Sequence, residues 1–395
     1  MKFVIEGLGL IAGGGKTGML RLLPSLAKHT RHEFVLLLPN LPEYSTARAT
    51  NLKLVLRPKP GNLLARHLYL NHTVPKICRE EGADALLCMG NFVPLRPRIP
   101  TVLFVQNPNY TYHEPVAYER ATLRERAIIR YARRCYRRLS PSVRVVVQTE
   151  VMKRRMAVLY NLDPSRIVVI ADTDALPATC TGQVRQRERA ASDPFTFLCL
   201  AVYSAHKNLE ILLEATKKLS AYTSRPARCL ITIAPQQHPG ARRLLEQVKR
   251  EKLEDLLMNI GPVSGAELER AYMLADAAIQ PTLLESFGRV YYESMRFNLP
   301  VLTSDRDFAR HVCHDAAVYF DPLDADSVAR AMAAIMEDEN LRSRLVENGR
   351  RIVQQIPSWD EVAARFVEVL ERTAGGHLAI DGKSESRHQE SPAPM

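Results

Sequence analysis

Two glutamates eight residues apart mark the segment whose spacing best suits chemistry. Residues 285–301 read ESFGRVYYESMRFNLPV, directly after an apolar run that predicts a strand. A helix is expected to start near Gly288, which places Glu285 on the preceding loop and Glu293 in the second turn. The amides of residues 287–290 would form an anion site at the helix N-terminus. Such a set can hold a diphosphate on the amides, a sugar hydroxyl on Glu285 and a ribose diol on Glu293. It equally suits two solvated glutamates beside an ordinary helix start.

A second candidate anion site is the glycine run that follows the first predicted strand. Gly13, Gly14 and Gly15 are adjacent, but the Walker A spacing fails because Leu10 stands where a glycine is required. The dinucleotide pattern fails as well, because Ala12 replaces its last glycine. What remains is a row of bare backbone amides opening a helix, on which an anion can rest. A flexible loop without a ligand is the alternative.

Polar side chains also follow the strand predicted at 101–105. Gln106 and Asn107 stand at the strand end, and His113 lies on the loop beyond it. Amide side chains at the carboxyl end of a parallel strand can hydrogen-bond sugar hydroxyls. A lone histidine is more often structural than catalytic, so His113 is a candidate acceptor contact beside a structural alternative.

A strongly basic segment is the fourth candidate for binding. The predicted helix over 117–139 has eight arginines: Arg120, Arg124, Arg126, Arg130, Arg133, Arg134, Arg137 and Arg138. Its apolar positions can face the core while the arginines cover the rest of the surface. A solvated helix face would explain them, but attraction to anionic lipid, at about 1 kcal/mol for each basic residue, would add up. Nucleic acid is the rival partner, and no nucleic-acid-binding motif supports it.

Composition bounds these possibilities. The chain has 395 residues, of which 46% are hydrophobic, and its net charge is +11. Residues 1–190 hold 30 basic and 14 acidic side chains, whereas residues 191–395 hold 24 and 29. One half is therefore built to meet something anionic. The seven cysteines form no CxxC pair, which favours buried free thiols over a zinc site, and no metal ligands are expected.

Two series of alternating strand and helix patterns must position these residues. The first predicts strands near 2–8, 33–38, 52–56, 84–88, 101–105, 143–147 and 166–170, with helices near 17–29, 64–81, 117–138 and 149–160. The second predicts strands near 195–200, 228–233, 256–260, 276–280 and 300–303, with helices near 207–221, 240–252, 264–274, 288–297, 325–336 and 339–354. The pattern is typical of an α/β protein in which two Rossmann-like, doubly wound domains face a central cleft, with ligands at the carboxyl ends of the strands.

The domain limits follow from the same pattern. We expect an N-terminal Rossmann-like domain over 1–176, a linker over 177–194 and a C-terminal Rossmann-like domain over 195–357. A capped amphipathic helix over 358–373 and a disordered tail over 374–395 complete the chain.

The C-terminal half resembles family 4 retaining glycosyltransferases of the GT-B fold (glycosyl transferases group 1). The segment ESFGRVYYESMRFNLPV resembles that family's EGFGxxxxEAMAxGxPV signature. The agreement extends to NIGPVSGAELERAYMLADAAIQPT before it, to AVYFDPLD after it, and to CLAVYSAHKNLE at 199–210. In this fold, the final helix crosses back to the N-terminal domain. The resemblance is weak over the N-terminal half, which in such enzymes varies with the acceptor.

The resemblance implies a role for each residue of the segment. Glu285 would contact the transferred hexose and Glu293 the ribose. Backbone near the sugar and diphosphate would come from Phe287, Gly288, Arg289 and Val290, beside the loop of Gly13, Gly14 and Gly15.

Lys207 would neutralise the leaving diphosphate, since negative charge develops on that oxygen as the glycosidic bond breaks. The family pairs this lysine with an arginine five or six places earlier, where this chain has Val202 and Ala201. His206 and Arg289 are the candidates for the second cation.

By resemblance, the chain is expected to be a metal-independent enzyme that transfers a hexose from a nucleoside-diphosphate sugar to a glycan or lipid-linked acceptor, with retention and without a cofactor. Expected partners are the nucleotide sugar, the acceptor and an anionic membrane surface, and not nucleic acid. Polysaccharide biosynthesis in the cytoplasm, at the inner face of the membrane, is the expected setting. The alternatives are a non-catalytic sugar-nucleotide-binding scaffold or another GT-B enzyme such as a nucleotide-sugar epimerase.

Overall fold

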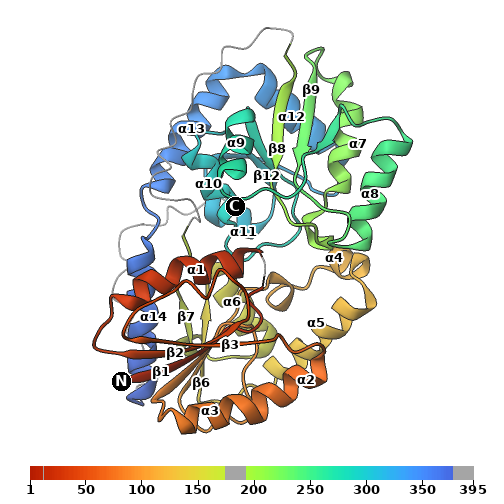
Figure 1. Ribbon diagram of the computed structural model, residues 1–395. Coiled ribbons are helices and arrows are strands. Elements are labelled where there is room, and N and C mark those ends of the chain that lie inside the picture. The colour runs from red at the N-terminus through yellow and green to blue at the C-terminus, as the bar shows by residue number, and fades with distance from the viewer. Residues whose placement is uncertain (12, 174–192, 377–395) are drawn as a thin grey trace.

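The computed structural model describes residues 1–11, 13–173 and 193–376. Two α/β domains lie one above the other, and each is built on a twisted sheet with helices on both faces (Figure 1). The predicted linker lies almost entirely outside the described residues, as does nearly all of the predicted tail. Both sheets are parallel throughout, and the expected fold class, two Rossmann-like doubly wound domains, is confirmed.

The N-terminal sheet has the order β3-β2-β1-β4-β5-β6-β7. Its strands are β1 (Lys2–Glu6), β2 (Glu33–Pro39), β3 (Leu52–Arg57), β4 (Ala85–Cys88), β5 (Thr101–Phe104), β6 (Val143–Val147) and β7 (Ile167–Val169). In the central strand β1, Val4 pairs with Val35 of β2 and Leu86 of β4. The strand order reverses beside β1, so the loops that follow β1 and β4 diverge at the carboxyl edge and leave room for a ligand.

The C-terminal sheet has the order β10-β9-β8-β11-β12-β13. Its strands are β8 (Phe195–Cys199), β9 (Ala227–Ile231), β10 (Leu257–Asn259), β11 (Ala277–Gln280), β12 (Val301–Ser304) and β13 (Ala317–Phe320). The order reverses between β8 and β11, where the Lys207 and Glu285 loops leave the sheet. The edge strand β13 is absent from the predicted strands, and its four residues entered the sequence analysis only as the start of the segment AVYFDPLD.

The helices of the N-terminal domain are α1 (Gly13–Ala27), α2 (Leu63–Leu68), α3 (Val74–Glu80), α4 (Pro115–Arg120), α5 (Leu123–Tyr136) and α6 (Glu150–Tyr160). Two predicted helices are interrupted. A π-type turn over Tyr69–Thr73 joins α2 to α3, where Pro75 has no amide to donate. The helix predicted over 117–138 breaks between Arg120 and Leu123, because Thr122 and Glu125 form a capping box that starts α5.

The helices that follow β8 are α7 (Glu210–Lys218), α8 (Pro239–Arg250), α9 (Ala266–Leu274), α10 (Arg289–Arg296), α11 (Asp307–Cys313), α12 (Ala325–Glu337), α13 (Glu339–Val353) and α14 (Trp359–Ala374). All were predicted except α11, which is short. None of the helices within the described ranges is both long and apolar enough to cross a bilayer.

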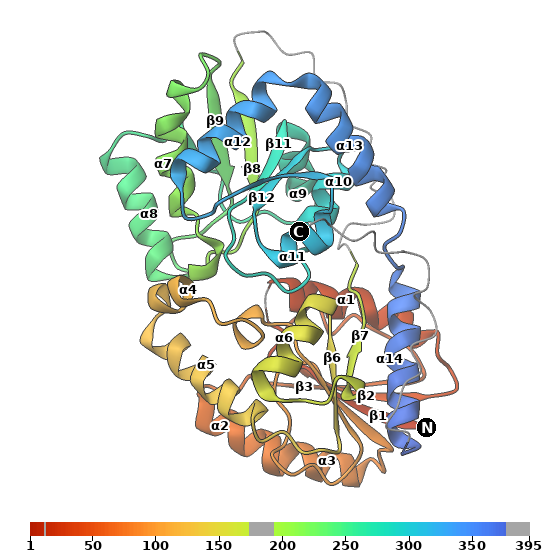
Figure 2. The ribbon, with the colours of Figure 1, turned by 180° about the vertical axis from the view of Figure 1, so that it is seen from behind.

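The last helix, α14, belongs to the C-terminal segment of the chain but packs on the N-terminal domain (Figures 1 and 2). Phe366 of α14 meets Phe104 of β5 edge to face, with ring centroids 5.1 Å apart. Lys28, just beyond α1, forms an ion pair with Asp360 at 2.7 Å. Because α14 shares a buried core with α1 and the sheet, the two domains are connected by more than one crossing of the chain.

Candidate functional site

A cleft of about 540 Å³ separates the two domains. Its N-terminal wall is formed by the loop after β1, the ends of β4 and β5, and the faces of α4 and α5. Its C-terminal wall is the loop that follows β8. Among the residues singled out from the sequence, it is lined by Gly14, Gly15, Gln106, Asn107, Val202, His206 and Lys207.

Lys207 and Glu285 meet at the C-terminal wall. The Lys207 Nζ lies 2.6 Å from Glu285 Oε2, and both side chains are mostly buried, with 17% and 16% exposed. Lys207 ends a 3-10 turn, and Asn208 follows it in the left-handed region and anchors the turn by donating to two carbonyls, of Pro281 and Pro322. Burial raises the pKa of Glu285, but the charge and hydrogen bond of Lys207 outweigh that effect, so the pKa lies below its usual value. Glu285 is therefore ionised at neutral pH and is held in place by Lys207.

The start of α10 is shaped by a glycine. Gly288 precedes the helix with a φ of +77°, and a Cβ at this position would lie 2.5 Å from the Tyr291 ring. No side chain caps the helix, so the first amides of α10 are left for another acceptor. Phe287 is buried and stacks on Tyr292 with the ring centroids 4.8 Å apart, which fixes the loop before the helix. The Val290 amide belongs to this same turn.

Glu293 is buried in the C-terminal domain. Its Oε2 accepts a hydrogen bond of 2.8 Å from the Tyr272 hydroxyl, and Tyr272 stacks on Phe297. Glu293 is only 5% exposed, so the interpretation of this glutamate as a solvated helix residue is wrong. A buried carboxylate that keeps a polar partner is suited to bind a ligand hydroxyl.

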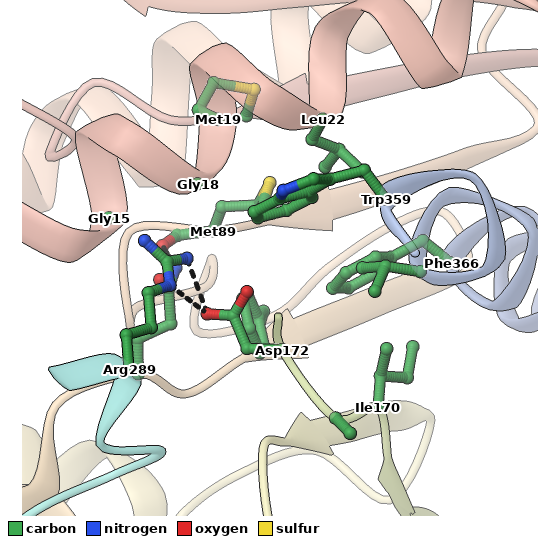
Figure 3. A pocket seen from close by; sticks show the side chains of 14 residues that line it. Gly15, Gly18, Met19, Leu22, Met89, Ile170, Asp172, Arg289, Trp359 and Phe366 are labelled. Atoms are coloured by element: carbon green, nitrogen blue, oxygen red, sulfur yellow. Dashed lines mark hydrogen bonds and ion pairs between the residues drawn. The ribbon is translucent and has the colours of Figure 1, made fainter. Parts of the chain in front are cut away.

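Arg289 spans the two domains. Its guanidinium donates to Asp172 Oδ2, from Nη2 at 2.6 Å and from Nε at 3.1 Å, and to the carbonyl oxygen of Gly14 at 2.6 Å. Figure 3 shows it reaching past Gly15 to Asp172, with Trp359 of α14 beside it, and the guanidinium carbon lies 5.5 Å from the Trp359 ring centroid. The cavity that these residues line is only about 20 Å³, room for one water molecule.

Neither candidate for the second cation beside Lys207 fits that role. The Arg289 side chain is committed to Asp172 and Gly14, away from Lys207. Burial, and then the charge of Lys207, lower the pKa of His206 to about 4, so its imidazole is neutral at pH 7. Val202, at the family's arginine position, is 54% exposed in the cleft.

The glycine run forms the first turn of α1. Gly13 has a φ of +62°, and Gly14 and Gly15 face the cleft. The carbonyl of Gly14 accepts from Arg289, so this turn lies directly across from the start of α10. The Arg289–Gly14 contact therefore joins the two segments predicted from the sequence as anion sites, of which Gly14 and Gly15 line the cleft.

Gln106 and Asn107 stand at the N-terminal wall as an ordered pair. Both backbone amides donate to Asn91 Oδ1, at 2.7 and 3.0 Å, and Gln106 Nε2 donates to the carbonyl of Met89. Asn91 adopts a φ of +64° at the end of β4 and was not identified from the sequence. His113, in contrast, is exposed and is not among the residues described as lining the cleft.

The basic segment divides into inward and outward arginines. Three are used internally: Arg120 donates to Asn208 Oδ1 of the other domain, Arg126 to Ala121, and Arg133 to Tyr112. The other five are exposed and have no polar partner within the described structure: Arg124, Arg130, Arg134, Arg137 and Arg138. These lie opposite the buried positions of α5.

Possible metal ligands and free thiols are scattered over the described residues. Across residues 1–11, 13–173 and 193–376, no three His, Cys, Asp or Glu side chains gather so that they could hold a metal ion. An Asp-x-Asp sequence, Asp172-Thr173-Asp174, does follow β7, but Asp172 is bound to Arg289 and Asp174 is outside the described residues. The six described cysteines are free thiols, and five of them are buried. Cys180 falls in the stretch that the structure does not describe.

Two family models cover most of the chain. Residues 12–171 match the model described as Glycosyltransferase Family 4, and residues 182–352 match Glycosyl transferases group 1.

Individual relatives match shorter stretches. A phosphatidyl-myo-inositol mannosyltransferase of Mycolicibacterium smegmatis is 32% identical over 152 residues, 37% of this chain and 39% of the relative. A D-inositol 3-phosphate glycosyltransferase of Kineococcus radiotolerans is 28% identical over 172 residues, 41% of this chain and 39% of the relative. The chain thus spans about two fifths of the length of these relatives.

A solved structure, that of HepE of Anabaena in complex with UDP-glucose, shares the fold over nearly the whole chain. The TM-score is 0.69 at 15% identity, and the match covers 94% of this chain and 99% of that one.

Proposed function

Because the chain belongs to the family 4 glycosyltransferases of the GT-B fold, we propose that it transfers a hexose from a nucleoside-diphosphate sugar to a glycan or lipid-linked acceptor, with retention of the anomeric configuration. The observation that carries the proposal is the Lys207–Glu285 pair: Lys207 lines the interdomain cleft, and Glu285 lies on the loop just before the uncapped start of α10. A cation, a carboxylate and free amides are the groups that a sugar diphosphate needs.

The donor would occupy the C-terminal wall. The amides of Arg289 and Val290 would receive the diphosphate, and Glu293 the ribose, since its carboxylate is buried and has a hydroxyl partner. Glu285 would turn its free lone pairs to the hexose, with the backbone of Phe287 and Gly288 close by. Gly14 and Gly15 would close over the donor from the opposite wall.

In the transfer step, the acceptor oxygen forms a bond to the anomeric carbon while the bond from that carbon to the diphosphate oxygen breaks. The proton of the acceptor hydroxyl passes to the departing diphosphate, on the same face of the sugar. Lys207 neutralises the charge that develops on the leaving oxygen, and it is held near that position before the reaction starts. This cation takes the role that a divalent ion plays elsewhere, so we propose that the reaction is metal-independent.

The acceptor would lie against the N-terminal wall, where Gln106 and Asn107 offer amide groups to its hydroxyls. His113 would contribute only at the entrance, because it is exposed outside the cleft lining.

Five arginines face outward around α5: Arg124, Arg130, Arg134, Arg137 and Arg138. At 100° per residue they span an arc of about 140° on the side opposite the buried residues of the helix. We propose that this arc rests on an anionic membrane surface on the cytoplasmic side.

The proposal is tested with the purified protein, a UDP- or GDP-hexose and a simple acceptor, and the product is examined by proton NMR with and without a chelator. Retention predicts that the first-formed product has the anomeric configuration of the donor, and metal independence predicts an unchanged rate in the chelator. An inverted product, or a rate restored only by Mg²⁺ or Mn²⁺, would contradict these points separately.

One observation favours a second candidate, a non-catalytic nucleotide-sugar-binding protein. The donor phosphates would meet a single cation from the C-terminal wall, because Val202 replaces the arginine, His206 is neutral and Arg289 is engaged elsewhere. A binding protein would be stabilised by nucleotide sugars but would release no nucleoside diphosphate over hours, whereas an enzyme releases it.

A further inference from the structure

The corner between α4 and α5 joins the N-terminal domain to the C-terminal wall of the cleft. In Figures 1 and 2, α4 lies at the junction of the two domains, below α8, and it packs against the 3-10 turn Ala205–Lys207. Arg120, the last residue of α4, donates from Nη1 to Asn208 Oδ1 at 2.5 Å. Asn208 directly follows the turn, so a side chain of the N-terminal domain reaches the residue next to Lys207.

Asn208 ties the Lys207 turn to the loop that carries Glu285. Its side chain is buried, and Nδ2 donates to the carbonyl oxygens of Pro281, just after β11, and of Pro322, at 3.2 and 2.7 Å. Both amide protons are thus used inside the C-terminal domain, whereas the partner of Oδ1 in the described structure is Arg120 of the other domain. A buried amide oxygen without a partner costs free energy. The hydrogen bonding of Asn208 is therefore complete when the corner is docked on the C-terminal domain.

A second contact from the same corner reaches the other end of the turn. Glu125 Oε2 lies 3.3 Å from Nε2 of His238, which caps α8. His238 Nδ1 accepts from the Gly240 amide at 2.9 Å, so the proton of the neutral imidazole belongs on Nε2 and points to the carboxylate. The His238 ring also stacks on Tyr203, just before the turn, with the ring centroids 5.1 Å apart. The corner therefore supports the turn on both sides, directly at Asn208 and indirectly at Tyr203.

We propose that Arg120 is a positioning residue, which holds the Lys207 turn and the Glu285 loop in the geometry required for transfer by completing the hydrogen bonding of Asn208. This inference rests on the proposed function and adds a residue of the N-terminal domain to the donor site. A cation stabilises a leaving group only if it is oriented before the bond breaks, and a small displacement lowers the rate. Because α4 and α5 also contribute to the lining of the cleft, an acceptor bound there contacts the same corner that supports the donor site.

The test compares the full wild-type chain with Arg120→Ala, Arg120→Lys, Asn208→Gly and the double variant Arg120→Ala/Asn208→Gly. The lysine of Arg120→Lys keeps a donor for Oδ1, and the glycine of Asn208→Gly suits the φ of +55° at this position while it removes the side chain. Arg79→Ala is the control, because Arg79 is an exposed arginine of α3, at the end of the N-terminal domain away from the cleft (Figure 1). The kcat and KM for nucleoside diphosphate release are measured with a panel of UDP- and GDP-hexoses, and the thermal shift caused by each nucleotide sugar is recorded.

We expect Arg120→Ala to lower kcat about twentyfold while the KM and the thermal shift for the nucleotide sugar change little, and Arg120→Lys to recover most of the lost rate. Asn208→Gly should lower kcat at least as much, and Arg120→Ala should add nothing further in that background, because both residues act through one contact. Arg79→Ala should behave as the wild type.

Two results would overturn this inference alone: a wild-type kcat in Arg120→Ala, or an equal loss from Arg120→Ala whether or not Asn208 is present. If the wild type releases no nucleoside diphosphate from any nucleotide sugar of the panel, the proposed function is overturned and this inference with it.

Discussion

The charged side chains at the carboxyl edges of the two sheets differ in whether they have partners within the protein. At the C-terminal edge, the lysine and the glutamates have internal partners: Lys207 pairs with Glu285, and Glu293 accepts from Tyr272. At the N-terminal edge, Lys59 on the loop after β3 and Arg124 on α5 have no ion pair or hydrogen bond in the described structure, and the polar groups that line the cleft include amides such as Gln106. A wall whose charges are already oriented suits a ligand of constant shape, the nucleotide diphosphate. A wall with unpaired positive charges suits a ligand that carries a negative charge.

Arg289 is the element that connects these two edges. Its backbone amide belongs to the donor wall, whereas its side chain holds Asp172 and the Gly14 carbonyl of the acceptor wall. The contrast between the edges can therefore be tested at each edge and at the residue between them.

Breaking the ion pair of the donor edge should have the largest effect. Lys207→Met removes the cation beside the leaving group and leaves the Glu285 carboxylate buried without its partner. We expect the rate of nucleoside diphosphate release to fall by about 100- to 1000-fold. The control is Lys217→Met, which breaks a surface ion pair between α7 and Glu251 at the end of α8 and should leave the rate unchanged. Equal rates for Lys207→Met and wild type would show that the pair has no part in the reaction.

A substitution at the start of α10 tests whether the donor edge depends on local backbone shape. Gly288 and Gly261 share a φ of +77°, but only at Gly288 would a Cβ meet a neighbour, the Tyr291 ring at 2.5 Å. Gly261→Ala should cost about 1 kcal/mol of unfolding free energy for the backbone alone, and Gly288→Ala about 3 kcal/mol or more. Urea denaturation of both variants checks the difference, and equal costs would contradict the close approach.

The stability of the donor edge should also depend on pH. The pKa of His206 is lowered to about 4, so the unfolded chain binds more protons than the folded chain between about pH 6.5 and 4. The contribution of His206 to the free energy of unfolding is therefore fully present above about pH 6.5, and it is lost as the pH drops through this window. Because the imidazole is only half-buried, we expect a loss of about 2 kcal/mol, measured by urea denaturation at several pH values. His206→Gln should flatten the dependence, and an unchanged slope in this variant would assign the loss to other groups.

The smallest effect is expected at the connecting residue. Arg289→Lys keeps the charge but loses the fork that bonds Asp172 and Gly14 together. We expect the KM for the nucleotide sugar to rise about fivefold to tenfold, with kcat changed less, because the walls close less firmly on the donor. Arg330→Lys, on the outer surface of α12, serves as the control. Steady-state kinetics that show a fall in kcat alone would instead assign Arg289 to the chemical step.

Much of the fold follows from the sequence, because buried parallel strands are short apolar runs and the capped helices have recognisable ends. The strand β13 and helix α11 escaped prediction because each is short. The donor residues Glu285, Gly288 and Glu293 lie close together in the chain, so their spacing was visible. Partners such as Asp172 for Arg289 are more than a hundred residues away, and no local pattern joins them.

The acceptor edge was least predictable for the same reason. The Asn91 side chain accepts from the backbone amides of Gln106 and Asn107 and so orients them. Its left-handed backbone conformation cannot be predicted from a single asparagine in the sequence. The sequence showed only an excess of positive charge in the N-terminal half, most visible on one predicted helix. Folding places the break at Thr122, so that Arg120 on α4 contacts Asn208 of the other domain while five arginines beyond the break face outward.

The central claim is that the donor edge binds a nucleoside-diphosphate sugar through Lys207 and Glu285. The most direct measurement is the melting temperature of the wild type and of Glu285→Ala with a panel of UDP- and GDP-sugars. At least one nucleotide sugar is expected to raise the melting temperature of the wild type, and the rise should be much smaller in Glu285→Ala. If no nucleotide sugar raises it, or if Glu285→Ala responds as the wild type does, the claim is contradicted.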